Sequence, residues 1–326
     1  MASMTGQIND FTAQVQTALF EPFRSVLADA ASKLWWPVAL LSLLIALASL
    51  GLRPFAAKLL ASDTWTSRSA RNDYLILFIN PVLQVTLLSF LALNYAIIGQ
   101  WIAAALTWAG VHGQATGGGA LLAGLALTAA LFVADDFARW STHYLQHRVP
   151  LLWEFHKVHH SAEVLNFLTV QRHHPLDPLF TTAVIGIVTA LVNGVFIGLF
   201  GDHLTIATVA GANIFRVASN ALGGLLRHSP FWLSFGGATE RWLVSPAMHH
   251  IHHSSDPKHY DTNFGTALSV WDRWAGTIYF ADGAPVTDFG VGEETLHFHS
   301  LTAIYLGPLQ RVWPARKSNA AAEANR

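Results

Sequence analysis

The stretch WEFHKVHHSAE at residues 153–163 places three histidines within five positions of a chain that is otherwise strongly apolar. Two similar clusters lie elsewhere, STHYLQH at residues 141–147 and MHHIHHS at residues 248–254. Side chains three or four positions apart share one face of a helix, so each cluster turns its imidazole rings in one direction. The question for the fold is therefore whether it brings these three clusters together.

The composition is that of a membrane protein. Of the 326 residues, 52% are hydrophobic and 12% are charged, and this charged share is about half the usual one. The formal net charge is −1 and no block of Lys or Arg stands out, so nucleic acid is not an expected partner. The chain has no cysteine, which excludes disulfides, thiolate zinc sites and iron–sulfur clusters. Any metal must be bound by nitrogen and oxygen.

Four segments are long and apolar enough to cross a bilayer, which takes about 20 residues of helix. They are residues 34–52, 74–98, 120–138 and 179–200. A fifth segment, residues 204–222, is a weaker span because it contains Asn213, Arg216 and Asn220. Residues 101–111 are too few to span, and we expect them to lie flat or to re-enter.

The positive-inside rule orients these spans. Basic residues occur between the first two spans and again in residues 139–177, whereas residues 99–119 contain no Lys or Arg. The bias brings all three histidine clusters to the cytoplasmic face. We therefore expect an all-α integral membrane protein with four to five transmembrane helices and a cytoplasmic helical cap that carries the histidines.

We expect a single membrane domain, residues 1–326, because no repeat or interdomain linker is evident. No cleavable signal peptide is apparent, and the apolar face of residues 1–33, interrupted by Pro22, predicts an interfacial amphipathic helix, with a frayed tail as the alternative. The other parts are membrane-anchoring spans at 34–134, a catalytic region with two further spans at 135–280, and a disordered tail at 315–326.

The number of imidazoles favours a binuclear metal site, since one metal ion accepts four to six ligands. Pro150 should break the helix between the first two clusters, so that the second folds back toward the first. Imidazole suits Zn, Cu, Fe and Ni alike. A histidine pH sensor is one alternative. A histidine-rich membrane metal transporter or sensor is another, but it would need polar groups inside the spans, which are almost free of them.

The boxes HYLQH, HKVHH and HHIHH resemble the HxxxH, HxxHH and HxxHH boxes of the fatty acid hydroxylase and sterol desaturase superfamily of membrane di-iron oxygenases. The surrounding stretches LWEFHKVHHSAE, QRHHPLD and SPAMHHIHHSSDPKHYDTNFGTALSVWDRWAGT resemble bacterial members, from about residue 135 to residue 280. His228 of LRHSP stands where the family has an additional histidine. The resemblance implies metal ligation by His143, His147, His156, His159, His160, His228, His249, His252 and His253.

His250 is left out of this set. Many relatives have Arg at this position, and the side chain of His250 points about 100° away from that of His249 around the helix.

Three residues are candidate catalytic residues beside the ligands. Asp136 lies two helical turns before the first box and is expected to accept a ring N–H from a ligand histidine, with a helix-end charge at the interface as the alternative. His174 matches a His-Pro of bacterial members, as a ligand or as support for one. Asn263, like Asp261, is a weaker candidate because polar loop residues are common. Asp272 is expected to fix a turn through Arg273 or the backbone.

The resemblance also implies a reaction. Two iron ions, for which zinc can substitute in purified protein, would use O2 as co-substrate to attack an unactivated C–H bond of a membrane lipid. Hydroxylation is the leading hypothesis, with a lipid or sterol desaturase or methyl oxidase of the same superfamily as the alternative. The bacterial resemblance places the protein in a bacterial inner membrane and favours a bacterial lipid over a sterol. The oligomeric state stays open.

Each turnover needs two external electrons. The chain has no GxGxxG motif, no cysteine and no His-Pro-Gly-Gly of the cytochrome b5 type. A separate electron-donor protein is implied, of the ferredoxin or cytochrome b5 type with its reductase. Basic side chains on the cytoplasmic face would dock an acidic carrier, unless they merely form a solvated face. They are Arg148, Lys157, Arg241 and Lys258.

Overall fold

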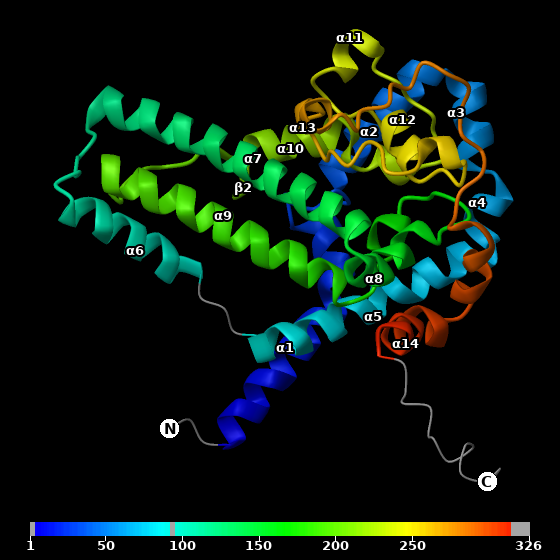
Figure 1. The fold of residues 1–326 in the computed structure, drawn as a ribbon, viewed down its shortest axis with the longest axis horizontal. Coiled ribbons are helices and arrows are strands. Elements are labelled where there is room, and N and C mark those ends of the chain that lie inside the picture. The colour runs from blue at the N-terminus through cyan, green and yellow to red at the C-terminus, as the bar shows by residue number, and fades with distance from the viewer. Residues whose placement is uncertain (1–3, 92–94, 314–326) are drawn as a thin grey trace, which may run out of the picture.

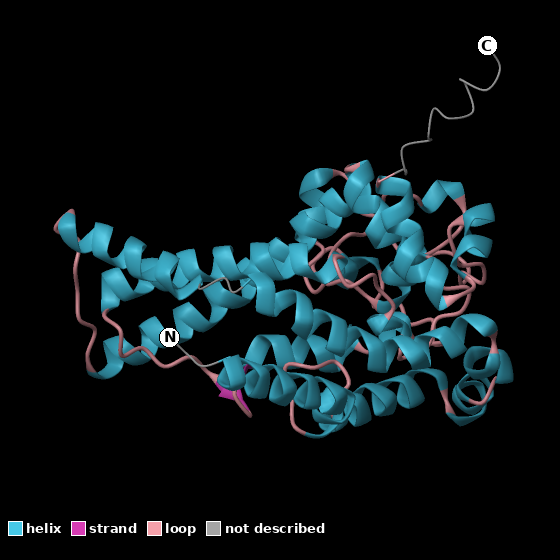
Figure 2. Ribbon diagram, turned by 90° about the horizontal axis from the view of Figure 1, so that it is seen from below, coloured by secondary structure: helices cyan, strands magenta, loops and turns pink. Residues whose placement is uncertain are grey.

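The computed structural model describes residues 4–91 and 95–313, and nearly all of its regular structure is helical (Figures 1 and 2). Helices α6 (Tyr95–Trp108), α7 (Gly117–Arg148) and α9 (Asp177–Phe200) extend to one side as an arm (Figure 1). Shorter helices gather at the other end as a cap. The tail predicted to be disordered, residues 315–326, lies outside the described residues.

Helix α7 connects the arm to the cap and ends just after the first histidine cluster. The residue before a proline disfavours the helical conformation, and Val149 is extended with φ −101° and ψ 113°. Pro150 then begins α8 (Pro150–His160), where its missing N–H costs nothing. The predicted break at Pro150 is confirmed, and it turns the second histidine cluster back onto α7.

Helices α7 and α9 are, among the described residues, the two that are long and apolar enough to cross a membrane. In their most apolar windows only 22% and 17% of the residues are buried inside the protein. A core helix of a globular protein would be buried, whereas these helices expose most of their apolar residues, as helices in a bilayer do. They are therefore candidate membrane spans, consistent with an all-α membrane protein. Helix α2 (Trp36–Leu50) and α6 are apolar but shorter.

The arm is built on close helix contacts. Gly99 of α6 faces Gly194 of α9, and a Cβ added at Gly194 would lie 2.5 Å from the carbonyl oxygen of Gly99. Small residues let two backbones approach in this way, which is a common basis for helix packing in membranes.

Residues 92–94 of the expected span at 74–98 lie outside the described residues, and the rest of this span falls in two helices. Its first part belongs to α5 (Arg68–Leu91), which begins in the cap, where buried Asp73 pairs with Arg172 at 2.9 Å. Its last part belongs to α6. The run at 101–111 was expected to lie flat or to re-enter. Most of it belongs to α6, which packs along α9.

The expected fifth span, residues 204–222, is wrong as a continuous helix. The segment forms the small hairpin β1 (Thr208–Val209) and β2 (Ala212–Asn213), then α10 (Ile214–Ser219) and the π-helical turn Asn220–Gly224. It returns toward the cap along α7, where Thr128 accepts a hydrogen bond from the backbone N–H of Ala207 at 2.9 Å. Further along, Arg216 pairs with Asp135. The chain still returns to the end that holds the histidines. It is held there by a hydrogen bond and an ion pair to α7, which a hydropathy profile does not show.

The remaining elements complete the cap. Helix α1 (Met4–Leu27) forms where an amphipathic helix was predicted and continues through Pro22. A buried apolar cluster of Ile76, Val158, Phe298 and Ile304 joins α5, α8 and the C-terminal helix. The other helices are α3 (Leu52–Leu59), α4 (Ser62–Thr66), α11 (Gly237–Glu240), α12 (Pro246–His252), α13 (Val270–Ala275), α14 (Leu301–Val312) and the 3-10 turns Thr169–Gln171, Leu226–His228, Pro257–His259 and Gly292–Phe298.

The close approach of α6 and α9 makes a testable prediction. Gly194→Ala would force the two backbones apart, and overpacking of this kind costs about 1–3 kcal/mol. We expect a lower thermal midpoint for the full chain in detergent. Gly118→Ala is the control, because a Cβ at Gly118 meets nothing within 4 Å. A Gly194→Ala protein that melts at or above the wild-type temperature would contradict the packing described.

Candidate metal centre

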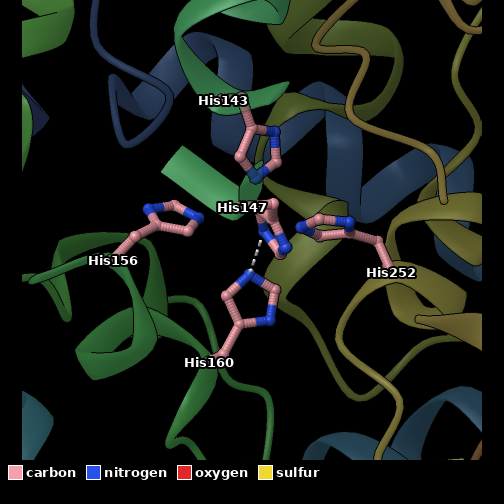
Figure 3. A group of neighbouring side chains, drawn as sticks. All are labelled: His143, His147, His156, His160 and His252. Carbon is pink, nitrogen blue, oxygen red and sulfur yellow. Dashed lines mark hydrogen bonds between the residues drawn. The ribbon is translucent and has the colours of Figure 1, made fainter. Parts of the chain in front are cut away.

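Nine histidines converge in the cap as two adjacent groups. The first group, shown in Figure 3, and the second group each hold one nitrogen per residue within 4.8 Å of all the others. The rings at the boundary touch, because the centroids of His160 and His253 are 4.5 Å apart. These nine are the histidines that the sequence marked. The first group is His143, His147, His156, His160 and His252, and the second is His159, His228, His249 and His253.

Four segments supply these rings, of which α7 and α8 are consecutive and the other two lie more than 60 residues further along the chain. Helix α7 contributes two side chains one turn apart, and α8 places its histidines on the facing side after the bend at Pro150. Helix α12 supplies the last box. His228 ends the 3-10 turn Leu226–His228, which packs on α12. The i, i+3 and i, i+4 spacing of each box is what aims the rings at a common centre.

In the second group the Nε2 atoms crowd one another. The Nε2 atom of His228 lies 3.1 Å from that of His159 and 3.0 Å from that of His249. The Nε2 atoms of His249 and His253 are 3.1 Å apart. A neutral imidazole carries one N–H, so these contacts cannot all be hydrogen bonds. Nitrogens bound at about 2.0–2.1 Å to one tetrahedral ion would lie about 3.3 Å apart, close to these distances. The group fits a shared cation.

In the first group, Nε2 of His147 lies 3.1 Å from Nε2 of His160, whereas three other members have the outer ring nitrogen held and the inner one free (Figure 3). The Nδ1 atom of His143 donates to the carbonyl of Phe264 at 2.8 Å, and that of His252 donates to the carbonyl of Thr262 at 2.7 Å. This fixes the tautomer and leaves the Nε2 lone pair facing inward. Among the described residues, the buried Nε2 atoms of His143, His156 and His252 have no hydrogen-bond partner.

Burial favours the neutral form of several of these rings. It lowers the pKa of His252 to about 3, and burial together with neighbouring imidazoles lowers the pKa of His249 and His253 well below the usual range. Neutral imidazole is the form that offers a lone pair to a metal.

Residues 262–268, here called the clamp loop, supply the two carbonyls that orient His143 and His252. Asn263 has φ 56° and is fully buried, and its amide donates to the carbonyls of Met248 and Tyr279. The candidate catalytic role of Asn263 therefore changes. It cannot reach the pocket, and it instead fixes the backbone on which two histidines depend.

Asp136 and Asp272 tie the clamp loop to α7. The carboxylate of Asp136 accepts from the backbone N–H of Ala267 at 2.8 Å, from that of Leu268, and from the indole of Trp271. Among the described residues Asp136 has no hydrogen bond to a histidine, so the expected bond from a ligand ring to Asp136 is not made. Asp272 accepts from the backbone N–H groups of Phe264 and Gly265, as expected for a turn-fixing residue.

His174 is also placed differently from the expectation. Its Nε2 donates to the carbonyl of Tyr305 at 3.0 Å, and its Nδ1 accepts from the backbone N–H of Leu176 at 3.2 Å. Both ring nitrogens are occupied away from the two groups, so His174 anchors α14 and is neither a ligand nor the support of one. His250, which the sequence left out, lies in neither group.

Sequence reasoning missed Asp177. Its carboxylate contacts Nδ1 of His156 at 3.2 Å and accepts from the side chain of Gln146 at 2.6 Å. It is the first residue of α9, so the start of a candidate span is joined directly to the histidines. The signal was the aspartate directly before Pro178 in RHHPLDP, which marks a helix start beside the boxes.

Two cavities reach the histidines. One, of about 210 Å³, lies between the ends of α7 and α9 and is lined by members of both groups. The other, of about 350 Å³, opens among loops of the cap beside His147 and His160. The centre is thus accessible from the side of the candidate spans and from the side of the cap.

Known proteins share this region of the chain. Ornithine lipid hydroxylase OlsE of Rhizobium tropici is 30% identical over 159 residues, which are 49% of this chain and 44% of that protein. Alkylglycerol monooxygenase is 28% identical over 149 residues in Homo sapiens, 45% of this chain and 29% of the relative. In Danio rerio it is 26% identical over 185 residues, 56% and 37% of the two chains.

The chain spans less than half the length of each of these relatives. No solved structure matches it. The fatty acid hydroxylase family model matches residues 128–277, a range that includes all nine histidines of the two groups. Residues 128–277 are therefore similar to a fatty acid hydroxylase domain.

Proposed function

We propose that the nine histidines hold two metal ions and that these ions are iron. The observation that carries the proposal is the pair of buried histidine groups with inward lone pairs. A ligand set of nitrogen alone excludes magnesium and calcium, which prefer oxygen, and leaves iron among the metals that imidazole suits. Similarity to the fatty acid hydroxylase family favours iron over zinc, copper and nickel.

The reaction that we propose is hydroxylation of a membrane lipid. Bound iron would supply the activation of O2, so that a C–H bond becomes C–OH while two electrons and two protons convert the other oxygen atom to water. The two kinds of relative are named as a lipid hydroxylase and a monooxygenase, which supports this choice over desaturation or methyl oxidation.

The residues of the chain would serve this reaction by position. The first turn of α9 and the last turns of α7 border the cavity between them, so an acyl chain entering from the membrane would reach both histidine groups. Asp177, Asp136 and Asn263 are positioning residues, since each acts through a histidine or through the clamp loop. We propose that the centre lies at the cytoplasmic face of a bacterial inner membrane, because Lys and Arg are concentrated in the loops on the side of the histidines.

The electrons would come from a separate donor protein. Among the basic residues considered for docking, Lys157 is unsuitable because its ammonium is buried between Glu154 at 2.7 Å and Glu294 at 2.8 Å. Arg148 and Lys258 also have acidic neighbours, whereas Arg241 has no ion-pair partner in the described part of the chain. Arg241 is thus the best of these candidates for contact with an acidic carrier.

A metal transporter is disfavoured by the candidate spans. Residues 117–134 of α7 and 178–200 of α9 contain no histidine or carboxylate. A path for metal ions through the bilayer would need such groups.

A matched pair of variants tests the proposal. His249→Gln removes a member of the second group, and we expect it to lower the iron content from about two per chain and to abolish the product. His250→Gln changes the adjacent buried histidine and should keep both. Iron is measured by mass spectrometry of the purified protein. The product is sought as a lipid heavier by one oxygen in cells that express each form.

Two results would count against this function. Equal iron and product in His249→Gln and His250→Gln would remove the ligand assignment. Loss of two hydrogens from a lipid, in place of an added oxygen, would replace hydroxylation by desaturation.

Asp177 gives a second prediction. Replacing a group that orients a ligand histidine weakens metal affinity by about 10–100-fold. We expect that effect from Asp177→Asn, because the amide cannot accept as strongly from His156. Competition with a chelator measures it. Asp202→Asn, at the exposed far end of the arm, is the control and should bind metal as the wild type does. Unchanged affinity in Asp177→Asn would show that His156 needs no such support.

A further inference from the structure

Basic side chains line the cavity between α7 and α9, and they add positive charge to that of the proposed metal ions. Besides histidines of both groups, its lining includes the side chains of Lys33, Arg139 and Arg227. The only carboxylate among its lining residues is Asp177, and that group already accepts hydrogen bonds from Gln146 and His156.

Arg227 is the most informative of these cations. It is 3% exposed, and its Nε atom has no hydrogen-bond partner in the described part of the chain. No carboxylate of the described residues forms an ion pair with Arg227 or with Lys33. Asp136 attracts the charge of Arg227 without forming an ion pair with it. A buried guanidinium that lacks an ion-pair partner is costly, so its retention calls for a further anionic partner.

The neighbouring acids do not meet this need. Asp135 is shared by Arg139, at 3.1 Å, and Arg216. The carboxylate of Asp136 is engaged by the clamp loop. Burial and the nearby Arg227 lower the pKa of Lys33 well below its usual value, so an anion beside it would be needed to keep its ammonium charged. Neutral histidine ligands would leave the full charge of bound metal in place as well.

The depth of the cavity suggests the source of the anion. Lys33 lies three residues before the start of α2, and Pro178 and Thr181 belong to the first turns of α9. These are the ends of apolar helices, and the ends of membrane helices lie at the level of the lipid headgroups.

We propose that Arg227 and Lys33 bind the anionic group, a carboxylate or a phosphate, of the lipid substrate. A guanidinium matches both groups through two parallel hydrogen bonds. The cavity touches histidines of both groups, so an acid held there would fix which carbon of the lipid lies beside the metals. This inference rests on the proposed function, and it selects acidic lipids over neutral ones such as alkylglycerols.

Binding, rather than turnover, tests the inference. Three lipids with the same brominated octadecanoyl chain are titrated into the full, iron-loaded protein in detergent, and quenching of tryptophan fluorescence gives each Kd. The probes are the free fatty acid, the lysophosphatidic acid and the neutral monoacylglycerol. We expect the acids to bind at least tenfold more tightly than the glycerol, and the better of the two identifies the group.

The variants assign this preference to the cavity. Arg227→Gln should raise the Kd of the acids at least tenfold and leave that of the glycerol within twofold, and Arg227→Lys should retain part of the preference. Lys33→Gln should act in the same direction, and it decides the question if Arg227→Gln does not fold. Arg53→Gln, which removes an exposed charge, is the control and should change nothing.

The inference is overturned if the three lipids bind equally, or if Arg227→Gln weakens all three alike. Iron and product measured on the same preparation separate the two proposals. Oxidation of a lipid without preference for acids would leave the hydroxylase and remove the acid site. A preference for acids in a protein that yields no oxidised lipid would leave the acid site and remove the hydroxylase.

Discussion

Nine imidazole rings, six of them buried and three half-buried, face one another in the cap, and their lone pairs set the constraint on which the rest of the structure depends. Polar atoms withdrawn from water need a partner, and these rings cannot satisfy each other because each neutral ring offers a single N–H. Two cations would meet the need at once. In our proposal the cap is therefore completed by metal, and folding and metal binding should be coupled, as in other proteins whose ligands come from distant segments.

The fold orients these rings by fixing the far side of several of them. The clamp loop offers carbonyls to His143 and His252, and Arg172 offers its carbonyl to His159. Asp136 and Asp272 hold the clamp loop by hydrogen bonds, so the orientation of the histidines depends on residues outside the two groups. Such outer contacts set ring direction and ligand strength, which short sequence boxes alone cannot do. The histidines also lie beside the candidate spans, at the C-terminal end of α7 and the N-terminal end of α9.

Local rules predicted the parts of this structure that depend on short spacing. The boxes were found because i, i+3 and i, i+4 positions share a helix face, and the bend at Pro150 follows from proline geometry. Long-range partners could not be found in this way. Asp136 was given a histidine as its partner because they share one helix, but the clamp loop, over a hundred residues away, reaches it first. Residues 204–222 were apolar enough to suggest a span, yet hydrogen bonds to Thr128 hold them beside α7 in a mostly non-helical form.

The proposals form one physical picture, in which neutral nitrogen ligands hold a charged centre and nearby cations hold an acidic lipid against it. X-ray absorption at the iron edge of the purified protein tests its central claim most directly. We predict a first shell dominated by nitrogen, the multiple scattering that imidazole rings produce, and more than one iron per chain. A shell dominated by oxygen, without imidazole scattering, would contradict the assignment of the nine histidines as ligands.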